Sequence, residues 1–145
     1  MLLNFKIIFC ISLFCCVSCS ILKQESYFKL EFGNSKFKIE LPNDLSKKEI
    51  IFNGTSSKEY RFTRKDSSTV FVTDSKNGSA LIHSFLERKD FIILLDEENV
   101  KYEFKENQRL FHMRKINGMF IGFANVIKND EDYFNSILAS FKKLK

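Results

Sequence analysis

Side chains that could do acid–base or metal chemistry are sparse in this chain of 145 residues. His83 and Glu87 stand four residues apart, so a helix would place both on one face, where they could contact the same metal ion. A protein metal site needs more ligands than these two, so we expect no metal. Asp96-Glu97-Glu98 could bind calcium or act as an acid and base pair, but it lacks the glycine and the alternating ligands of a calcium loop. We interpret it as an exposed acidic turn.

Activated nucleophiles are also missing. Ser67-Ser68-Thr69 lacks the glycines that frame a nucleophile elbow, and no glycine-rich phosphate loop occurs in the chain. His112 stands between Phe111 and Met113 in a predicted strand, where we expect it to face solvent. The sequence therefore predicts a protein that is not an enzyme and has no cofactor.

The amino-terminal residues have the parts of a secretory signal peptide. Lys6 is followed by an apolar run from Ile7 to Val17 and by the small residue Ser18. The run is short for a bilayer span, which needs about 20 apolar residues. We predict a leader over residues 1–18, with a single-span anchor as the alternative.

The box Cys16-Val17-Ser18-Cys19 resembles that of bacterial lipoproteins, in which a small residue precedes the lipidated cysteine. Val17, Ser18 and Cys19 fit the pattern, while Cys16 stands where leucine is usual. The resemblance implies that Cys19 is lipidated and becomes the first mature residue; an ordinary cleaved signal is the alternative. We therefore expect a protein of the cell envelope. Because Ser20 follows the cysteine, we expect the outer membrane, facing the periplasm or the cell surface, rather than the inner membrane.

The remaining chain predicts a tether over residues 19–27 and one globular domain over residues 28–145. All four cysteines lie at or before Cys19, which leaves the domain without a disulfide, a thiol nucleophile or a cysteine zinc site. Removal of Lys6 leaves 22 basic and 18 acidic residues, a balance of +4. Basic and acidic residues alternate along the chain, so we do not expect nucleic-acid binding.

Period-two alternation dominates from Tyr27 onward and predicts hairpins. Apolar residues alternate with charged ones over residues 28–32 and 37–41, on either side of a turn at Gly33-Asn34-Ser35, and Pro42 ends the pair. Asn53-Gly54, Asn77-Gly78 and Asn117-Gly118 supply the positive φ angles of tight hairpin turns. Further strands are predicted at Tyr60–Thr63, Thr69–Thr73, Phe91–Leu95, Val100–Phe104, Arg109–Ile116 and Met119–Ile127.

Two segments favour helix. Residues 79–89 fit a short helix, although Asn77-Gly78 before them is also compatible with a returning strand. The carboxyl-terminal segment is clearer, with Asp130 as N-cap and with Lys142 and Lys143 in the last turn. Its apolar face is made of Phe134, Ile137, Leu138, Phe141 and Leu144.

Two stretches of the chain resemble the PsbP and Mog1-like domains. Residues 37–42, Phe-Lys-Ile-Glu-Leu-Pro, look like that family's opening strand, and the segment from Asn117-Gly118 to Ser140-Phe141-Lys142 is similar to its closing strand and helix. The resemblance implies an α+β fold in which helices flank an antiparallel sheet as an α/β/α sandwich, and a role as an accessory protein. If residues 79–89 form a strand, the alternative is a lipocalin-like β-barrel with a carboxyl-terminal helix.

The resulting hypothesis is a lipid-anchored, non-enzymatic adaptor that binds another envelope protein. A lipocalin-like carrier of a small hydrophobic ligand is the alternative. The sequence does not identify the partner, the ligand, the membrane leaflet or the oligomeric state.

Overall fold

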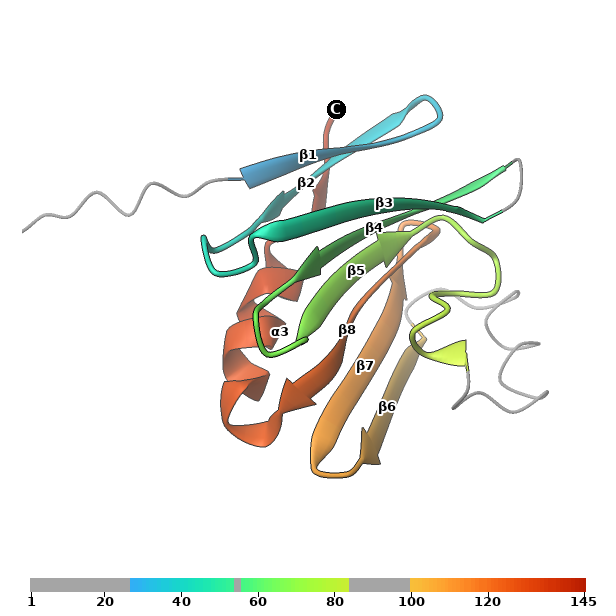
Figure 1. Cartoon of the computed structure of the whole chain (residues 1–145). Coiled ribbons are helices and arrows are strands. Elements are labelled where there is room, and N and C mark those ends of the chain that lie inside the picture. Colours follow the sequence, from blue (N-terminus) through green and yellow to red (C-terminus); the bar gives the residue numbers. More distant parts are fainter. Residues whose placement is uncertain (1–26, 54–55, 84–99) are drawn as a thin grey trace, which may run out of the picture.

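The computed structural model describes residues 27–53, 56–83 and 100–145 (Figure 1). These residues form two antiparallel sheets and one α-helix. The strands are β1 (Tyr27–Phe32), β2 (Ser35–Glu40), β3 (Lys47–Asn53), β4 (Ser57–Thr63), β5 (Thr69–Thr73), β6 (Lys101–Glu106), β7 (Arg109–Ile116), β8 (Met119–Ile127) and β9 (Lys142–Lys143). A short 3-10 turn, η2 (Lys128–Asp130), leads into α3 (Glu131–Ala139).

The smaller sheet has the order β1-β2-β9, and the larger has the order β3-β4-β5-β8-β7-β6. The β1–β2 hairpin confirms the predicted alternation, since Leu30, Phe37 and Ile39 point into the core while their charged neighbours do not. Gly33 takes a φ of +54° in its turn. The first described strand begins at Tyr27.

The predicted strands β5, β7 and β8 have the expected bounds, and β4 and β6 overlap their predicted ranges. Asn117 and Gly118, with φ of 53° and 74°, connect β7 to β8 as predicted. Asn107 and Gln108, also at positive φ, connect β6 to β7 without a glycine, and this turn was not predicted. Asn77-Gly78 closes a turn through the Gly78 amide and the Ser75 carbonyl rather than a strand-to-strand hairpin. Asn53-Gly54 lies partly outside the described residues.

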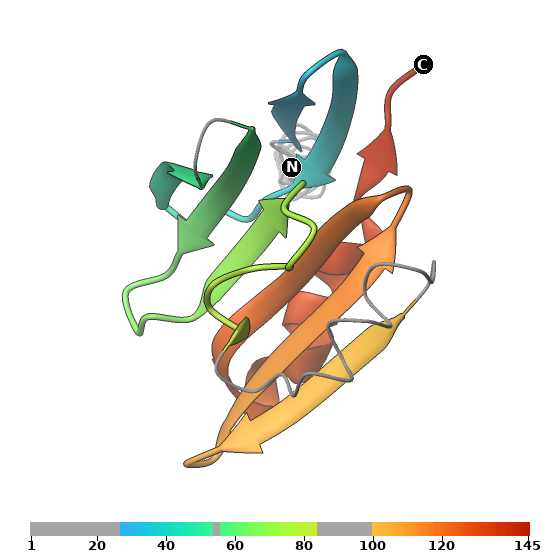
Figure 2. The same cartoon turned by 90° about the vertical axis from the view of Figure 1, so that its right-hand side faces the viewer.

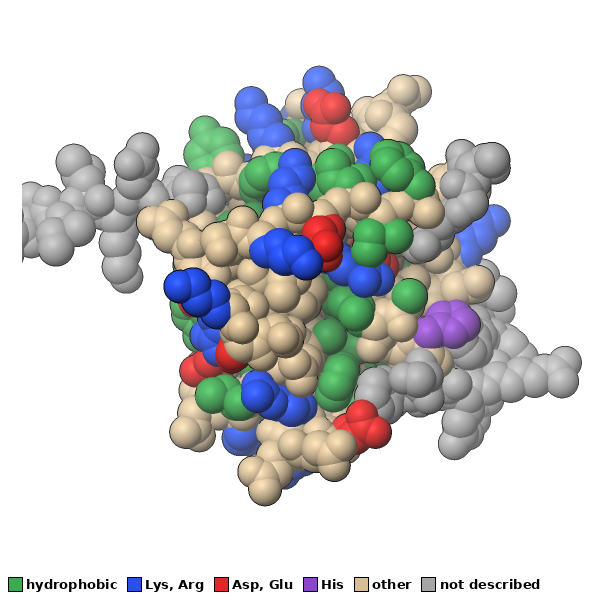
Figure 3. Space-filling view, viewed as in Figure 1, with side chains coloured by type: hydrophobic (Ala, Val, Ile, Leu, Met, Phe, Trp, Pro, Cys, Tyr) green, Lys and Arg blue, Asp and Glu red, His purple; other side chains and the backbone are tan. Residues whose placement is uncertain are grey.

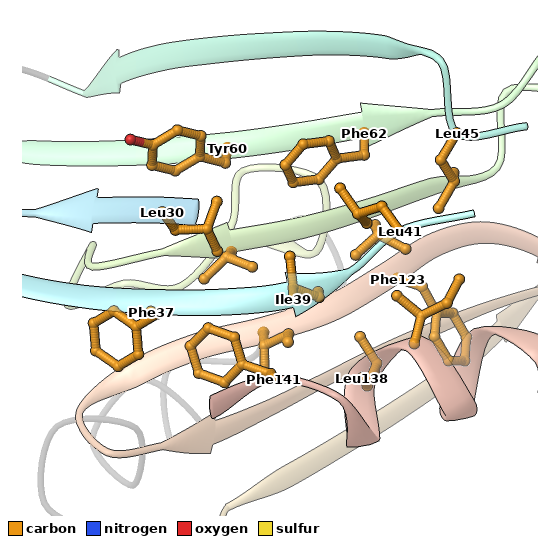
Figure 4. Packing of buried hydrophobic residues seen from close by; sticks show 14 of the residues in the cluster. Leu30, Phe37, Ile39, Leu41, Leu45, Tyr60, Phe62, Phe123, Leu138 and Phe141 are labelled. Carbon is orange, nitrogen blue, oxygen red and sulfur yellow. The ribbon is translucent and has the colours of Figure 1, made fainter. Parts of the chain in front are cut away.

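The main core lies between one face of the larger sheet and a cover made by the β1–β2 hairpin and α3 (Figures 1 and 4). Phe37 of β2 stacks on Phe141 with ring centroids 5.1 Å apart, and Phe123 of β8 meets Phe134 of α3 at 5.7 Å. A second cluster of Phe71, Ile82, Met113 and Phe120 lies on the opposite face of the sheet. Both faces of the central strands are therefore apolar, as buried strands require.

The carboxyl-terminal helix is shorter than predicted. It ends at Ala139, and Lys142 and Lys143 pair with β2 as strand β9 instead of forming a last helical turn. Phe141 is buried as expected, but it lies beyond the helix in an extended segment. The amide of Leu144 in that segment donates a hydrogen bond to the Lys36 carbonyl at 2.8 Å. Asp130 is the N-cap residue as predicted, but its side chain makes no capping bond and pairs with Arg64 instead.

The fold is α+β, with antiparallel sheets and a carboxyl-terminal helix, as predicted. The lipocalin-like barrel is wrong for the described part of the chain, because both sheets are open and β3 and β6 form free ends of the larger one. Within residues 79–83, the Ile82 amide bonds to the Ser79 carbonyl in a turn. Residues 84–89, where helix and strand were the alternatives, and the predicted strand Phe91–Leu95 lie outside the described residues. No helix in the described ranges is long and apolar enough to cross a bilayer.

Candidate functional site

Most of the predicted site residues fall outside the residues that the structure describes. These are Cys19, Glu87 and the run Asp96-Glu97-Glu98. His83 is described and exposed. Ser68 is buried and donates both its amide and its hydroxyl to Asp66, each at 3.0 Å, so its role in the β4–β5 turn is structural. Within the described ranges, no three His, Cys, Asp or Glu residues come together as a metal site.

His112 contradicts the expectation of a solvent-facing side chain, because only 4% of it is exposed. Its ring packs 5.1 Å from that of Phe123, and its Nδ1 lies 3.3 Å from Oε1 of Glu103. Burial lowers the pKa of His112 below its ordinary value of 6.5, against the opposing effect of Glu103. The ring lines a surface pocket of about 230 Å³ with Lys128 and Glu131, at the amino-terminal end of α3. The residues that line it include no Ser, Thr or Cys.

An exposed sheet edge lies along β3. This strand ends the larger sheet, and its hydrogen-bonded neighbour is β4 alone (Figure 1). An edge strand offers unpaired backbone N–H and C=O groups to another chain, and proteins usually protect such edges with charges or prolines. Lys47, Lys48 and Glu49 supply charges in the first half of β3, but Ile50, Ile51 and Phe52 do not continue them.

Large apolar side chains are exposed in that second half. Phe52 is 69% exposed and Ile50 is 42% exposed. Both lie on the same face of the sheet as Tyr60 and Phe62 of β4, which the β1–β2 hairpin covers. The hairpin packs on β4 instead, where Phe28 meets Phe62 and Phe32 meets Tyr60, each at 5.2 Å. On this face of β3, Ile50 and Phe52 are therefore left open to solvent.

Two lysines frame these apolar side chains. Lys48 Nζ lies 4.0 Å over the ring of Phe28, and Lys58 Nζ lies 5.9 Å over the ring of Phe52. Figure 3 shows hydrophobic and basic side chains interspersed over this part of the molecule. We call Lys48, Ile50, Phe52 and Lys58 the β3 edge surface. Sequence reasoning missed it because residues 47–52 do not alternate, although three adjacent apolar residues after three charged ones were a usable signal.

A polar network fastens the β4–β5 turn to the beginning of α3. Arg64 donates to Asp66 through Nε at 3.0 Å and through Nη2 at 2.6 Å, and Nη2 also pairs with Asp130. The hydrogen bonds from Arg64 hold the pKa of the Asp66 carboxyl far below the ordinary value of 3.8. The Tyr133 hydroxyl donates to Asp44 Oδ1 at 2.5 Å, and burial together with that carboxylate raises the pKa of Tyr133. We interpret this cluster as a structural network that holds the β4–β5 turn against the beginning of α3.

Asp66→Asn is expected to destabilise the protein at pH 7 by about 1 to 2 kcal/mol, after allowance for the solvent exposure of the carboxylate. A carboxyl group whose folded pKa is depressed stabilises the fold above its ordinary pKa of 3.8 and loses that contribution as the pH falls below it. Urea unfolding at pH 7 and pH 3 should therefore show a gap between wild type and variant that narrows in acid. The exposed Glu106→Gln is the control; an equal gap for Asp66→Asn at both pH values would contradict the pairing.

Comparisons with known proteins identify no relative. No family model, curated protein or solved structure matches the chain. Function is therefore inferred below from the amino-terminal sequence pattern and from the surfaces of the fold.

Proposed function

We propose that this protein is a non-enzymatic adaptor of the bacterial cell envelope, anchored by a lipid on Cys19 and binding another envelope protein along β3. The sequence supports the anchor through the leader, the small residue Ser18 and the cysteine that follows it. The mature chain would leave the membrane as a short tether and enter the fold at Tyr27.

The observation that carries the partner proposal is the open edge of β3. An extended segment of a partner can add to such an edge by main-chain hydrogen bonds, while side-chain contacts provide specificity. Ile50 and Phe52 suit a partner with apolar residues at alternate positions, and Lys48 and Lys58 suit acidic residues beside them. Burial of a side chain such as Phe52 contributes about 1.5 to 3 kcal/mol.

The resemblance to PsbP and Mog1-like domains belongs to the same proposal. An antiparallel sheet that closes with a strand, a helix and Ser140-Phe141-Lys142 is compatible with it. The accessory roles of that family support an adaptor. The carrier alternative loses its structural basis, because the open sheets of the described residues do not enclose a barrel interior.

A double substitution, Ile50→Lys with Phe52→Lys, is expected to abolish partner binding. Both side chains are exposed, but the new charge at position 52 would lie directly opposite Lys58, so we expect the free energy of unfolding to fall by no more than about 1 kcal/mol. New charges on an edge strand oppose the addition of another strand. The measurement is cross-linking in living cells from a photoreactive residue placed at Lys48, with and without the double substitution.

The matched control carries the photoreactive residue at Ala139, an exposed position on α3. One discrete cross-linked band from position 48, absent from position 139 and lost in the double variant, is the expected pattern. Equal bands from both positions, or a band that survives the double substitution, would contradict docking along β3. A band at twice the mass of the chain would make the partner a second copy.

A further inference from the structure

The β1–β2–β9 sheet carries a row of lysines that the sequence does not display. Directly opposite residues of antiparallel strands point to the same face, and the register places Lys29 opposite Lys38 and Lys38 opposite Lys142. The inward face of the hairpin holds the buried Leu30, Phe32, Phe37 and Ile39, so the lysine row faces outward. The β1–β2 hairpin and the distant strand β9 thus bring three ammonium groups onto one surface.

The neighbours of this row do not neutralise it. Lys36 lies on the same outward face with Glu31, its directly opposite residue, and their charged atoms are 4.0 Å apart. Glu40 is the other acidic residue of this face, beside Tyr27. The four lysines of the face (Lys29, Lys36, Lys38 and Lys142) therefore exceed its two acids (Glu31 and Glu40). Basic side chains are visible along the top of Figure 3, where Figure 1 places the hairpin.

Like charges directly opposite each other destabilise a sheet, so this row costs stability unless an anion lies against it. Tyr27 supplies a second feature of the face, because its ring is 56% exposed and lies 5.3 Å below the Lys38 ammonium. Tyrosine beside lysine is an arrangement typical of protein surfaces at the bilayer interface.

The position of the face in the chain indicates which anion it meets. Eight peptide steps separate Cys19 from Tyr27, so the chain between them spans at most about 28 Å. A lipid on Cys19 would hold the hairpin that begins at Tyr27 within that distance of the headgroups. Clustered lysines near a membrane bind anionic lipids by electrostatic attraction.

We propose that the outward face of the β1–β2–β9 sheet, formed by Lys29, Lys36, Lys38, Lys142 and Tyr27, lies against an anionic lipid surface and orients the domain there. This inference builds on the proposed anchor at Cys19. It leaves the edge of β3 beside the membrane-facing sheet and places α3 and the β6–β7 hairpin on the side away from the bilayer (Figures 1 and 2).

The test uses the predicted mature chain, residues 19–145, with Cys19→Ser, so that neither the apolar leader nor a lipid anchor contributes to vesicle binding. We expect the protein to bind vesicles of phosphatidylethanolamine that contain about 30% phosphatidylglycerol, because the anionic lipid gives them a negative surface. We expect no binding to vesicles of phosphatidylcholine. Binding should weaken steeply with added salt, because the attraction is electrostatic. Equal binding to both kinds of vesicle, or none to either, would overturn the proposal and would leave the anchor at Cys19 to be judged by membrane fractionation.

The triple variant Lys29→Gln, Lys38→Gln and Lys142→Gln is expected to bind the acidic vesicles about 100-fold more weakly, since each lysine near such a surface contributes strongly. It should unfold at the same or a higher urea concentration than the parent, because the like-charge row is removed. The control triple Lys65→Gln, Lys76→Gln and Lys105→Gln removes the same charge from exposed positions outside this sheet and should keep most of the binding. Equal losses in the two triples would show attraction by net charge alone and overturn the assignment of this face.

Discussion

Gly122→Ala is expected to destabilise the protein by about 3 kcal/mol or more, at the upper end of the range for overpacked cores. A Cβ at position 122 would lie 2.0 Å from the His112 carbonyl oxygen and 2.5 Å from the Phe71 ring. Strand β8 is paired on both sides, to β5 through Phe71 and to β7 through Met113, so neither neighbour can move away without breaking a ladder. Side-chain rotation does not relieve a clash with a backbone oxygen.

The urea midpoint and the m-value measure this effect, and Gly33→Ala is the matched control. Gly33 also changes from glycine to alanine, but a Cβ there meets nothing within 4 Å, and the cost of its φ of +54° is about 1 to 2 kcal/mol. A loss in Gly122→Ala no greater than that in Gly33→Ala would contradict the close approach of β7 and β8.

Cys19→Ala is expected to move nearly all of the protein from the membrane fraction to the soluble fraction. Each buried methylene of an acyl chain contributes about 0.8 kcal/mol to membrane binding, so acyl chains on Cys19 would hold the protein firmly in the bilayer. Replacing the cysteine removes the site of acylation and therefore the anchor. Fractionation in high salt, which weakens any residual attraction of the lysines to lipid, measures the change.

The matched control is Cys16→Ala, which alters the neighbouring cysteine of the same box and should remain with the membranes. Labelling with a clickable fatty acid should mark the wild type and Cys16→Ala but not Cys19→Ala. A Cys19→Ala protein that still fractionates wholly with membranes would contradict the lipid anchor.

Local sequence patterns predicted the parts of the fold that local physics decides. Alternation gave the β1–β2 hairpin, and the positive φ preference of Asn117-Gly118 gave the turn between β7 and β8. Strand β3 was missed because Lys47-Lys48-Glu49 followed by Ile50-Ile51-Phe52 has no period of two. Such a strand is specified by its pairing with β4 and not by its own pattern.

The errors at the carboxyl terminus and at His112 have a common cause in tertiary contacts. The spacing of Phe141 and Leu144 fits a helix, but backbone bonds to β2 are available only in the folded protein and end α3 earlier. His112 alternates with Met113, so one of them was expected to face water. The second apolar cluster buries Met113 on one face of the sheet, while His112 is buried on the other.

The two candidate surfaces differ in what a sequence can reveal. The exposed Ile50 and Phe52 are visible as an apolar run, although their exposure depends on where the hairpin stops. The lysine row is invisible in the sequence, because Lys29, Lys38 and Lys142 meet only through the register of three strands.

Native mass spectrometry of the protein, released gently in detergent from the membranes of its own organism, would examine the lipid anchor and the partner together. We expect a lipid mass increment on Cys19 and one co-migrating protein, and we expect the Ile50→Lys and Phe52→Lys variant to lose the co-migrating protein but keep the increment. An unmodified Cys19, or a lipidated chain that carries no partner or keeps its partner in the variant, would show that the protein is not a lipid-anchored adaptor that binds along β3.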